Sequence, residues 1–306
     1  MNDKPTLQDL LEVQQLFGLP SPALVEKDWY VVRALAAIAD ADPSPLRLVF
    51  GGGTALSRAH RLIRRMLEDV DLKIVADHPS RAQLRALREK ITTALLTVGF
   101  QFDPENREHR LSQNETRYTL FRLPYTPSAA GEGVLRPRIQ IELAVWPLLL
   151  PDTPRSVRSF VAEANRRDAE IPAIACVSVA QTAAEKFVAL TRRIGAERAQ
   201  GLVPDRTLLR HIYDLWAVRE HYDPGVAAKL IPTLIKSDAD TFARQFAAYQ
   251  ANPLAAIRQV IEALTAEPVY AREFDVFLRD MVYGEPVDFH VALRELQQLF
   301  ALLDKT

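Results

Sequence analysis

A glycine-rich turn between apolar runs is the sequence feature that most restricts how this chain can fold. Residues 46–50, LRLVF, form a run typical of a short buried strand and lead directly into residues 51–54, GGGT. Because glycine has no Cβ atom, such a turn permits unusual backbone angles and the close approach of a phosphate. We expect a helix to follow to about Met66, with its free N–H groups and positive dipole end directed at the same space. Thr54 would either cap this helix or contact the phosphate.

Two other phosphate-binding designs also begin with a glycine turn, and both lack support here. The dinucleotide-binding fingerprint needs a third glycine after Gly51 and Gly53, but Leu56 stands at that position. A Walker A loop needs Gly-Lys-Ser/Thr, and no such sequence follows the turn. The turn by itself is therefore a weak signal that leaves the class of phosphate site open.

Two aspartates on the next predicted strand narrow the choice. In residues 69–75, DVDLKIV, Asp69 and Asp71 are two positions apart. On a strand both carboxylates therefore project from one face, while Val70 and Leu72 face the core. Two carboxylates a few ångströms apart repel each other by about a kilocalorie per mole or more at intermediate dielectric. A divalent cation removes that repulsion, and hard oxygen ligands suit Mg²⁺ bound with a triphosphate. The combination favours a nucleotide-transferring site over a pair of solvated acids.

The stretch from Phe50 to Leu72 resembles the AbiEii/AbiGii-type nucleotidyltransferase toxin family, a group that includes the mycobacterial MenT toxins and belongs to the polymerase-β-like nucleotidyltransferase superfamily. The family signature is close to F-x-G-G-T-x-L-x-K/R, followed after a spacer by R-F-S-E-D-I-D-L. The residues that fall on this signature are Phe50, Gly52, Gly53, Thr54, Leu56, Arg65, Glu68, Asp69, Asp71 and Leu72. Met66 and Leu67 stand where the signature has Phe-Ser.

Three further segments extend the resemblance, because each matches a charged pattern of the family. They are residues 25–29 for E-K-D-aromatic, Glu185-Lys186 for E-K, and Arg210 with Asp214 for R-D-x-x-D-L. In the last segment His211 stands where the family has its first aspartate. The likeness therefore touches much of residues 25–220, with its strongest specificity between Gly52 and Asp71.

The resemblance implies an enzyme that transfers a nucleoside monophosphate from an NTP to a hydroxyl acceptor and releases pyrophosphate. In related toxins the acceptor is the 3′ end of tRNA, and a cognate antitoxin is encoded nearby. NTP, tRNA and an antitoxin are therefore the expected partners, and Mg²⁺ or Mn²⁺ is the expected cofactor. Two competing hypotheses are a nucleotidyltransferase that modifies a small molecule or a protein side chain, and a non-catalytic binding module that keeps the fold.

The resemblance also assigns roles to individual residues. The expected catalytic residues are Asp69, Asp71, Lys186 and Asp214, the expected NTP phosphate-binding residues are Gly52, Gly53, Thr54, Arg65 and Lys186, and the expected metal ligands are Asp69, Asp71 and Glu142. Alternation in RIQIELAVW places Glu142 with Gln140 opposite apolar residues, although a solvated polar face is an equally good interpretation. Lys186 could instead be a surface lysine paired with a nearby glutamate. Asp214 could orient the acceptor, or it could pair with Arg210 four residues earlier on one helix.

Hydrophobic periodicity divides the chain into a mixed lobe and a helical lobe. In the first lobe, helices are expected near residues 7–17, 22–39 and 80–98, and strands at GFQFD, TRYTLFRL and RIQIELAVW, with the last two strands joined by the turn TPSAAGEG. Strong helical periodicity follows at residues 179–194 and 205–220, and further helices run to Leu303. We therefore predict an α+β fold. It comprises a nucleotidyltransferase lobe over residues 1–150, with a mixed β-sheet flanked by helices, and a mainly helical lobe over residues 151–306 that completes the active site.

Charge and cysteine content add limits. The formal net charge is −1, which argues neither for nor against a nucleic-acid partner. Arg58, Arg61, Arg64 and Arg65 would lie mostly along one side of the helix after the glycine turn, as a solvated face or as an electrostatic rim around a phosphate site. The single cysteine, Cys176, lies in an apolar run and is expected to be buried in the core of a protein from a reducing compartment.

Several classes of function are not supported. No run approaches the roughly 20 apolar residues of a membrane span, and the first residues lack the apolar core of a signal peptide, so a cytoplasmic protein is expected. The histidines show no H-x-x-x-H pairing, which makes a zinc site unexpected. The G-x-S-x-G motif of serine hydrolases is absent as well.

Overall fold

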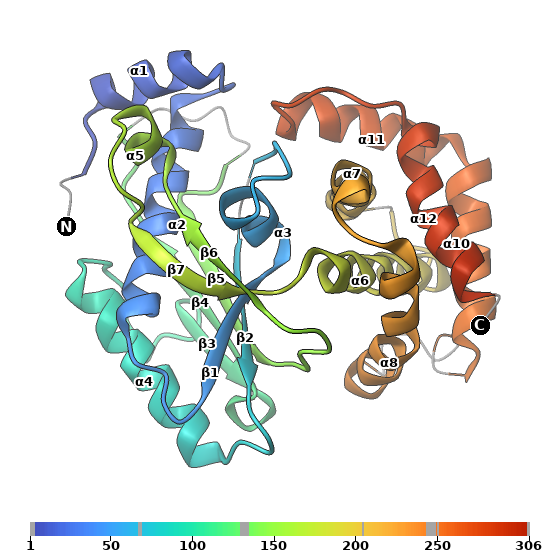
Figure 1. The fold of residues 1–306 in the computed structure, drawn as a ribbon, viewed down its shortest axis with the longest axis horizontal. Coiled ribbons are helices and arrows are strands. Elements are labelled where there is room, and N and C mark those ends of the chain that lie inside the picture. Colours follow the sequence, from blue (N-terminus) through green and yellow to red (C-terminus); the bar gives the residue numbers. More distant parts are fainter. Residues whose placement is uncertain are drawn as a thin grey trace. The chain divides into compact units, whose positions relative to one another are not determined.

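The chain forms two compact units, Met1–Val177 and Ser178–Thr306, shown by colour along the sequence in Figure 1. The computed structural model describes residues 4–66, 69–128, 135–203, 205–242, 249 and 251–304. The boundary between the units follows residue 177 and differs from the expected boundary at residue 150. The difference arises because two strands after residue 150 still pair with the sheet of the first unit.

The described part of the first unit is built around a seven-stranded mixed sheet with the strand order β3-β4-β5-β2-β1-β7-β6. Its strands are β1 (Arg47–Gly51), β2 (Asp69–Val75), β3 (Arg110–Gln113), β4 (Tyr118–Pro124), β5 (Arg138–Val145), β6 (Thr153–Val157) and β7 (Ile171–Cys176). β2 is parallel to β5 and β1 is parallel to β7, whereas the other neighbours are antiparallel. The predicted α+β class with a mixed sheet is confirmed.

The helices of the first unit begin where local sequence signals place them. They are α1 (Leu7–Phe17), α2 (Pro22–Asp40), α3 (Gly52–Thr54), α4 (Arg81–Thr97) and α5 (Phe160–Ala164), with a short 3₁₀ turn η2 (Asn114–Thr116) between β3 and β4. The hydroxyls of Thr6, Ser21 and Ser80 accept hydrogen bonds from amides in the first turns of α1, α2 and α4. Pro22 stands at the first position of α2, where its fixed φ suits a helix start. The three helices predicted for this region are confirmed to within a residue or two.

The core of the first unit lies between the sheet and the helices α2 and α4, which pack against each other (Figure 1). Leu35 of α2 and Ile91 of α4 are fully buried there, together with Leu72 of β2 and Ile141 of β5. Burial of each such side chain contributes about 1.5–3 kcal/mol. Because side chains alternate along a strand, this core fixes which residues of β2 and β5 project from the opposite face.

The helix predicted to run from the glycine turn to Met66 is shorter than expected. α3 passes into a π-helical segment, η1 (Ala55–Ala59), in which the His60 amide donates to the carbonyl of Ala55. Arg61 then adopts a φ of 60°, a left-handed conformation that ends the helix. π-Helical segments are rare and often occur at functional sites.

The four arginines after the turn therefore do not share one helix face. Arg58 and Arg65 are buried, whereas Arg61 and Arg64 are exposed. Neither a solvated helix face nor a continuous arginine rim describes them, because half of the set packs inside the first unit.

The remaining differences concern strands. GFQFD does not form a strand, although Phe100 and Phe102 join the core as an alternating pattern would suggest. The strands β3, β6 and β7 were not expected from the sequence. Residues 129–134, which contain most of the predicted TPSAAGEG turn, lie outside the described residues.

The second unit is helical in its described part, as predicted. Its elements are α6 (Val179–Ala199), η3 (Arg206–Leu209), α7 (Arg210–Val218), η4 (Arg219–His221), α8 (Pro224–Phe242), α10 (Pro253–Ala266), α11 (Pro268–Met281) and α12 (Phe289–Leu303). α6 contacts α7, α8 and α10, and it is buried on several sides as the central helix of this unit. Within the described residues, no helix combines the length and the apolarity that crossing a membrane requires.

Candidate active site

Three carboxylates occupy neighbouring positions on the sheet face opposite the core. Asp69 and Asp71 alternate with the fully buried Val70 along β2. In the parallel pairing of β2 with β5, Asp71 lies beside Glu142 and Asp69 lies beside Gln140. Neighbouring strands are about 4.8 Å apart, so the structure brings together the three acids that the sequence proposed as metal ligands.

The glycine turn packs directly against this acidic face. Gly51 pairs with Asp71 across β1 and β2, so the turn begins beside this acid. Gly52 has a φ of 68°, and a Cβ atom placed on it would lie 1.7 Å from Oδ2 of Asp71. A Cβ atom on Gly53 would lie 2.3 Å from Nη2 of Arg65. Gly52 is favoured both by its left-handed backbone and by the Asp71 carboxylate, whereas a side chain at position 53 would require the Arg65 guanidinium to shift.

Gly52→Ala is expected to lower nucleotide transfer by about a hundredfold, because the new methyl group displaces the Asp71 carboxylate by an ångström or more. The left-handed backbone adds a destabilisation of about 1–3 kcal/mol. Steady-state kinetics and thermal melting would measure the two effects. Gly18→Ala is the matched control, since Gly18 has a φ of 61° with nothing within 4 Å of its added Cβ. Equal activity losses in both variants would contradict the steric argument.

Thr54 joins the turn to the acidic strand, and Arg65 lies beside the turn. The Thr54 hydroxyl donates a hydrogen bond to the backbone carbonyl of Asp69, and the side chain is buried. The Thr54 hydroxyl does not cap the helix, because Gly51 precedes α3 and Thr54 makes no side-chain capping bond at the start of η1. Nη1 of Arg65 donates to the carbonyl of Met66 at 2.9 Å. The phosphate contacts assigned to Thr54 and Arg65 remain predictions, and the Thr54 side chain holds the turn to β2.

Two neutral side chains that the sequence assignment did not include contact the acids. Nε2 of Gln140 donates to Oδ1 of Asp69 at 2.8 Å. Tyr118 on β4 hydrogen-bonds Glu142, and burial, followed by the negative charge of Glu142, raises the pKa of the Tyr118 hydroxyl. Alternation in RIQIELAVW already placed Gln140 on the face of Glu142, but Tyr118 could be found only from the register between β4 and β5.

The donor chemistry of this face fits a divalent cation. Carboxylate oxygens of Asp69, Asp71 and Glu142 are the hard ligands that Mg²⁺ and Mn²⁺ prefer, and their backbone positions are adjacent. Among the described residues, no three acidic, histidine or cysteine side chains are already gathered around one point. Rotation about side-chain bonds would be needed to gather the three acids, since Asp69 is turned towards Gln140. Their assignment as metal ligands remains a prediction.

Lys73 is a further charged residue on the same face, two positions beyond Asp71 on β2. The side chain is 8% exposed, and its ammonium group lies 5.8 Å from the centroid of the Trp146 ring. Such a contact between a cation and an aromatic face is attractive. The sequence assignment missed Lys73, although its even spacing from Asp69 and Asp71 was visible in DVDLK.

The second unit contains the two remaining predicted catalytic residues, and it brings them together. Nζ of Lys186 on α6 donates to Oδ2 of Asp214 on α7 at 2.6 Å, and both side chains are buried. Lys186 is therefore not the surface lysine that the sequence allowed. The ion pair that the structure gives Asp214 is with Lys186, rather than with Arg210 on its own helix. Burial lowers the pKa of the neighbouring His211, and the positive charge of Lys186 lowers it further.

Comparison with known proteins decides the family. A family model described as "Nucleotidyl transferase AbiEii toxin, Type IV TA system" matches residues 33–300. The chain belongs to this family. The AbiEii match includes the glycine turn, the acidic strand and the helices that carry Lys186 and Asp214. The protein is accordingly a nucleotidyltransferase of the toxin class, as the resemblance predicted.

The fold is similar to that of a solved nucleotidyltransferase toxin. MenT4 from Mycobacterium tuberculosis H37Rv aligns with a TM-score of 0.61 at 18% sequence identity, over 97% of this chain and 90% of that chain. A comparison with curated proteins finds no match. At this identity the likeness establishes the fold, and the family match carries the enzyme class.

The early E-K-D segment of this AbiEii protein has a structural role that its sequence did not reveal. Asp28 on α2 is buried, and its Oδ1 lies 3.1 Å from Nε of Arg58 in η1. Its Oδ2 accepts a hydrogen bond of 2.8 Å from the amide of Phe160 at the start of α5. The Arg58 guanidinium lies 3.7 Å from the centroid of the Phe160 ring. Asp28 therefore joins α2, α5 and the segment that follows the glycine turn.

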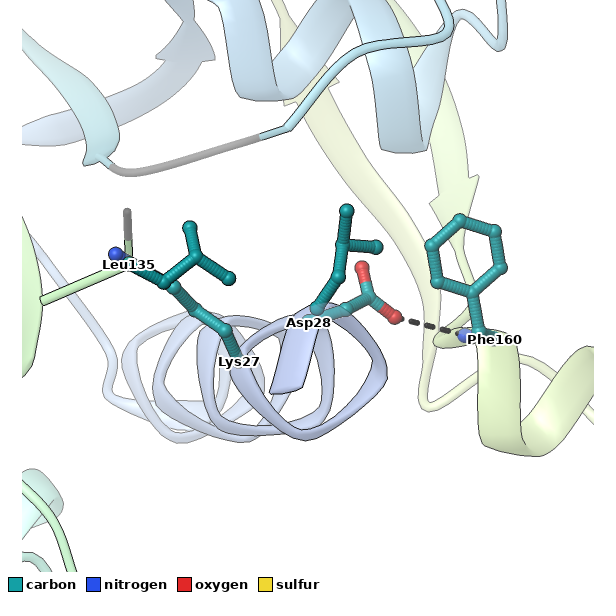
Figure 2. A pocket seen from close by; sticks show the side chains of 5 residues that line it. Lys27, Asp28, Leu135 and Phe160 are labelled. Carbon is teal, nitrogen blue, oxygen red and sulfur yellow. Dashed lines mark hydrogen bonds between the residues drawn. The ribbon is translucent and has the colours of Figure 1, made fainter. Parts of the chain in front are cut away.

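A small cavity adjoins this cluster, and Figure 2 shows Lys27, Asp28, Leu135 and Phe160 around it. Its volume is about 10 Å³, which accommodates about one water molecule and no nucleotide. The cavity belongs to the buried E-K-D cluster and is not a candidate for the NTP site.

The ionisation of Asp28 should make the stability of the toxin depend on pH. Burial raises the pKa of Asp28 from 3.8 to about 6, despite the opposing charge of Arg58. A raised pKa means that the folded protein holds this proton more tightly, so the associated stabilisation is complete below about pH 4 and is lost as the pH rises through 6. We expect the stability of the native protein, relative to that of Asp28→Asn, to fall by about 2 kcal/mol between pH 4 and pH 7.

Denaturant unfolding at several pH values would measure this difference. Asp77→Asn is the control, because Asp77 is exposed just beyond β2. A difference between the native protein and Asp28→Asn that stays constant across this pH range would contradict the predicted ionisation.

Proposed function

We propose that this AbiEii protein transfers a nucleoside monophosphate from an NTP to a hydroxyl of RNA, the 3′ end of tRNA, and releases pyrophosphate. The observation that carries the proposal is the glycine turn seated on Asp71, beside the neighbouring acids Asp69 and Glu142. The turn would offer backbone N–H groups to phosphate oxygens, and the three neighbouring acids would hold a divalent cation. A phosphate-binding turn beside a cation-binding set of acids is the arrangement that transfer of a nucleotidyl group requires.

Asp69, Asp71 and Glu142 are the residues that would hold Mg²⁺ or Mn²⁺. Such an ion, when bound, polarises the phosphoryl oxygens and lowers the pKa of the attacking hydroxyl. The three acids supply hard oxygen ligands on one face of the sheet, and their separate contacts with Gln140, Gly52 and Tyr118 limit how far each can move.

The chain's own residues mainly position and neutralise the NTP. Backbone amides of Gly52, Gly53 and Thr54 would face the outer phosphates, and Arg65, which lies beside Gly53, would neutralise their charge. The Thr54 hydroxyl holds the turn to β2. The acceptor oxygen forms its bond to the α-phosphorus as the bond from that phosphorus to the α–β bridging oxygen breaks. Pyrophosphate leaves with the bridging oxygen, and the hydroxyl proton passes to solvent. Lys186 contacts the triphosphate and Asp214 orients the acceptor, roles that rest on the family resemblance.

Modification of tRNA would explain why members of this family are toxins, because tRNA with a modified 3′ end cannot carry an amino acid into translation. The family description names a type IV toxin–antitoxin system. We therefore propose that a cognate antitoxin is encoded beside this gene and that its co-expression relieves growth arrest by the toxin.

Incubation of the protein with each of the four α-labelled NTPs and total tRNA tests the proposal. We expect label from one or more NTPs to appear in tRNA on a denaturing gel, and to disappear in the Asp69→Asn/Asp71→Asn double variant. Parallel reactions contain small hydroxyl compounds or protein as acceptors. Label in these acceptors and none in RNA would replace the tRNA assignment by the alternative transferase. Equal toxicity of the native protein and the double variant would support a non-catalytic binding module.

A further inference from the structure

One row of side chains crosses three strands beside the candidate active site. Arg122 on β4 pairs with Gln140 on β5, and Gln140 in turn pairs with Asp69 on β2. Within this row the Gln140 amide nitrogen donates to Oδ1 of Asp69 at 2.8 Å. Gln140 is thus the described side chain that reaches Asp69 from the neighbouring strand. Its position follows from the parallel register of β2 and β5.

The chemistry of this contact is asymmetric between the two carboxylate oxygens. A side-chain amide N–H is a donor, so it occupies Oδ1 of Asp69 and leaves Oδ2 available to another ligand. The amide is neutral and does not titrate, so it supports the charged carboxylate without competing with a cation for it. A lysine or arginine at this position would neutralise Asp69, and a glutamate would repel it.

The other two acids are positioned by different means. The Asp71 carboxylate packs against Gly52, in space that a side chain at position 52 would fill, and Glu142 accepts a hydrogen bond from Tyr118. Each acid therefore has its own partner from the same sheet or turn. The contact made by Gln140 can be removed without touching the partners of Asp71 and Glu142.

We propose that Gln140 is a positioning residue whose side-chain amide holds Oδ1 of Asp69, presents Oδ2 to the divalent cation, and so sets the cation affinity of the site. This inference rests on the proposed metal-dependent function. Hydrogen-bonding partners of metal-binding carboxylates typically change metal affinity by about 10- to 100-fold when they are removed. Gln140 touches the cation only through Asp69, so its loss should weaken binding and leave the chemical step intact at saturating metal.

If Gln140 served only the fold, its replacement would lower the melting temperature of the protein. Gln140 is half-buried, whereas its neighbours Ile139 and Ile141 fill the core. Gln140→Leu keeps the size of the side chain and the strand, and it removes the donor. We therefore expect its melting temperature to stay within a few degrees of the native value.

The experiment is a titration of the full chain with Mn²⁺, without NTP, followed by electron paramagnetic resonance or calorimetry. We expect Gln140→Leu to raise the Mn²⁺ dissociation constant by about 10- to 100-fold, and Gln140→Glu to alter it as well because the donor is replaced by an acceptor. At saturating Mn²⁺ the kcat of Gln140→Leu should recover to within about threefold of the native value. Gln101→Leu is the matched control, because Gln101 is exposed in the segment between α4 and β3.

The outcomes separate this inference from the proposed function. If the native protein binds Mn²⁺ and Asp71→Asn does not, but Gln140→Leu binds it within twofold of the native affinity, the positioning role of Gln140 is overturned alone. If the native protein binds no Mn²⁺, or Asp71→Asn binds it equally well, the metal site of the proposed function fails and the inference fails with it. A large loss of kcat that saturating Mn²⁺ does not restore would also overturn the positioning role.

Discussion

Replacement of Asp71 with asparagine is expected to lower the rate of nucleotide transfer by at least about a thousandfold. The change keeps the size of the side chain but removes one of the negative charges proposed to hold the cation. Loss of several kilocalories per mole of transition-state stabilisation corresponds to this factor. Asparagine also relieves the repulsion between Asp71 and its neighbours Asp69 and Glu142, so we expect the melting temperature to stay equal or to rise.

Labelled-NTP transfer and thermal melting on one preparation would check both parts of this prediction. Asp77→Asn is the control, since it makes the same chemical change at an exposed position just beyond the same strand. Full activity of Asp71→Asn would remove the acidic face from the mechanism. A fall in the melting temperature of many degrees would mean that Asp71 serves the fold instead.

Lys186→Met is expected to destabilise the second unit by about 3–5 kcal/mol. The Lys186 and Asp214 side chains are 7% and 0% exposed, and methionine leaves the buried Asp214 carboxylate without this counter-charge. Removal of one partner of a buried pair costs more than the pair itself contributes, because the remaining charge stays away from water. Denaturant unfolding monitored by circular dichroism would measure the loss. A change below about 1 kcal/mol would show that the pair is solvated like a surface salt bridge.

The double variant Lys186→Met/Asp214→Leu separates the structural role of the pair from the role predicted for Lys186 in binding triphosphate. Replacement of both charges by apolar side chains of similar volume commonly recovers stability. We expect the double variant to regain most of the lost stability while nucleotide transfer stays low. Recovery of activity together with stability would mean that Lys186 only holds α6 and α7 together.

The acidic strand could be predicted from the sequence because its signal is local. Asp69, Val70, Asp71 and Leu72 alternate within one strand, and alternation alone determines which side chains share a face. The glycine requirement at Gly52 was equally visible from the motif. The physical reason for it was not, because the Asp71 carboxylate that excludes a Cβ atom comes from another strand.

The parts that could not be predicted depend on contacts distant in sequence. β6 and β7 contain proline and lack clean alternation. The place of β7 in the sheet comes from pairing with β1, far earlier in the chain, and β6 in turn pairs with β7. The helix after the turn ends early, at the left-handed Arg61, although its residues favour a helix, and Arg65 then lies next to Gly53. Tertiary packing here overrides local propensity. The same holds for Asp214, whose partner came from a different helix rather than from four residues away.

The contact between Gly52 and Asp71 makes the tolerance of one position depend on the identity of the other. While Asp71 is acidic and its Oδ2 fills this space, any side chain at position 52 meets a steric obstacle. A chain that lost the acid would lose that obstacle but would keep the left-handed backbone, which still disfavours other residues. Substitution of Gly52 during evolution is therefore expected only after Asp71 has been replaced, and even then few residues would be tolerated. In a related chain, glycine at position 52 without the aspartate at position 71 would indicate that the backbone conformation is kept. Glycine and aspartate together would indicate that the site is kept.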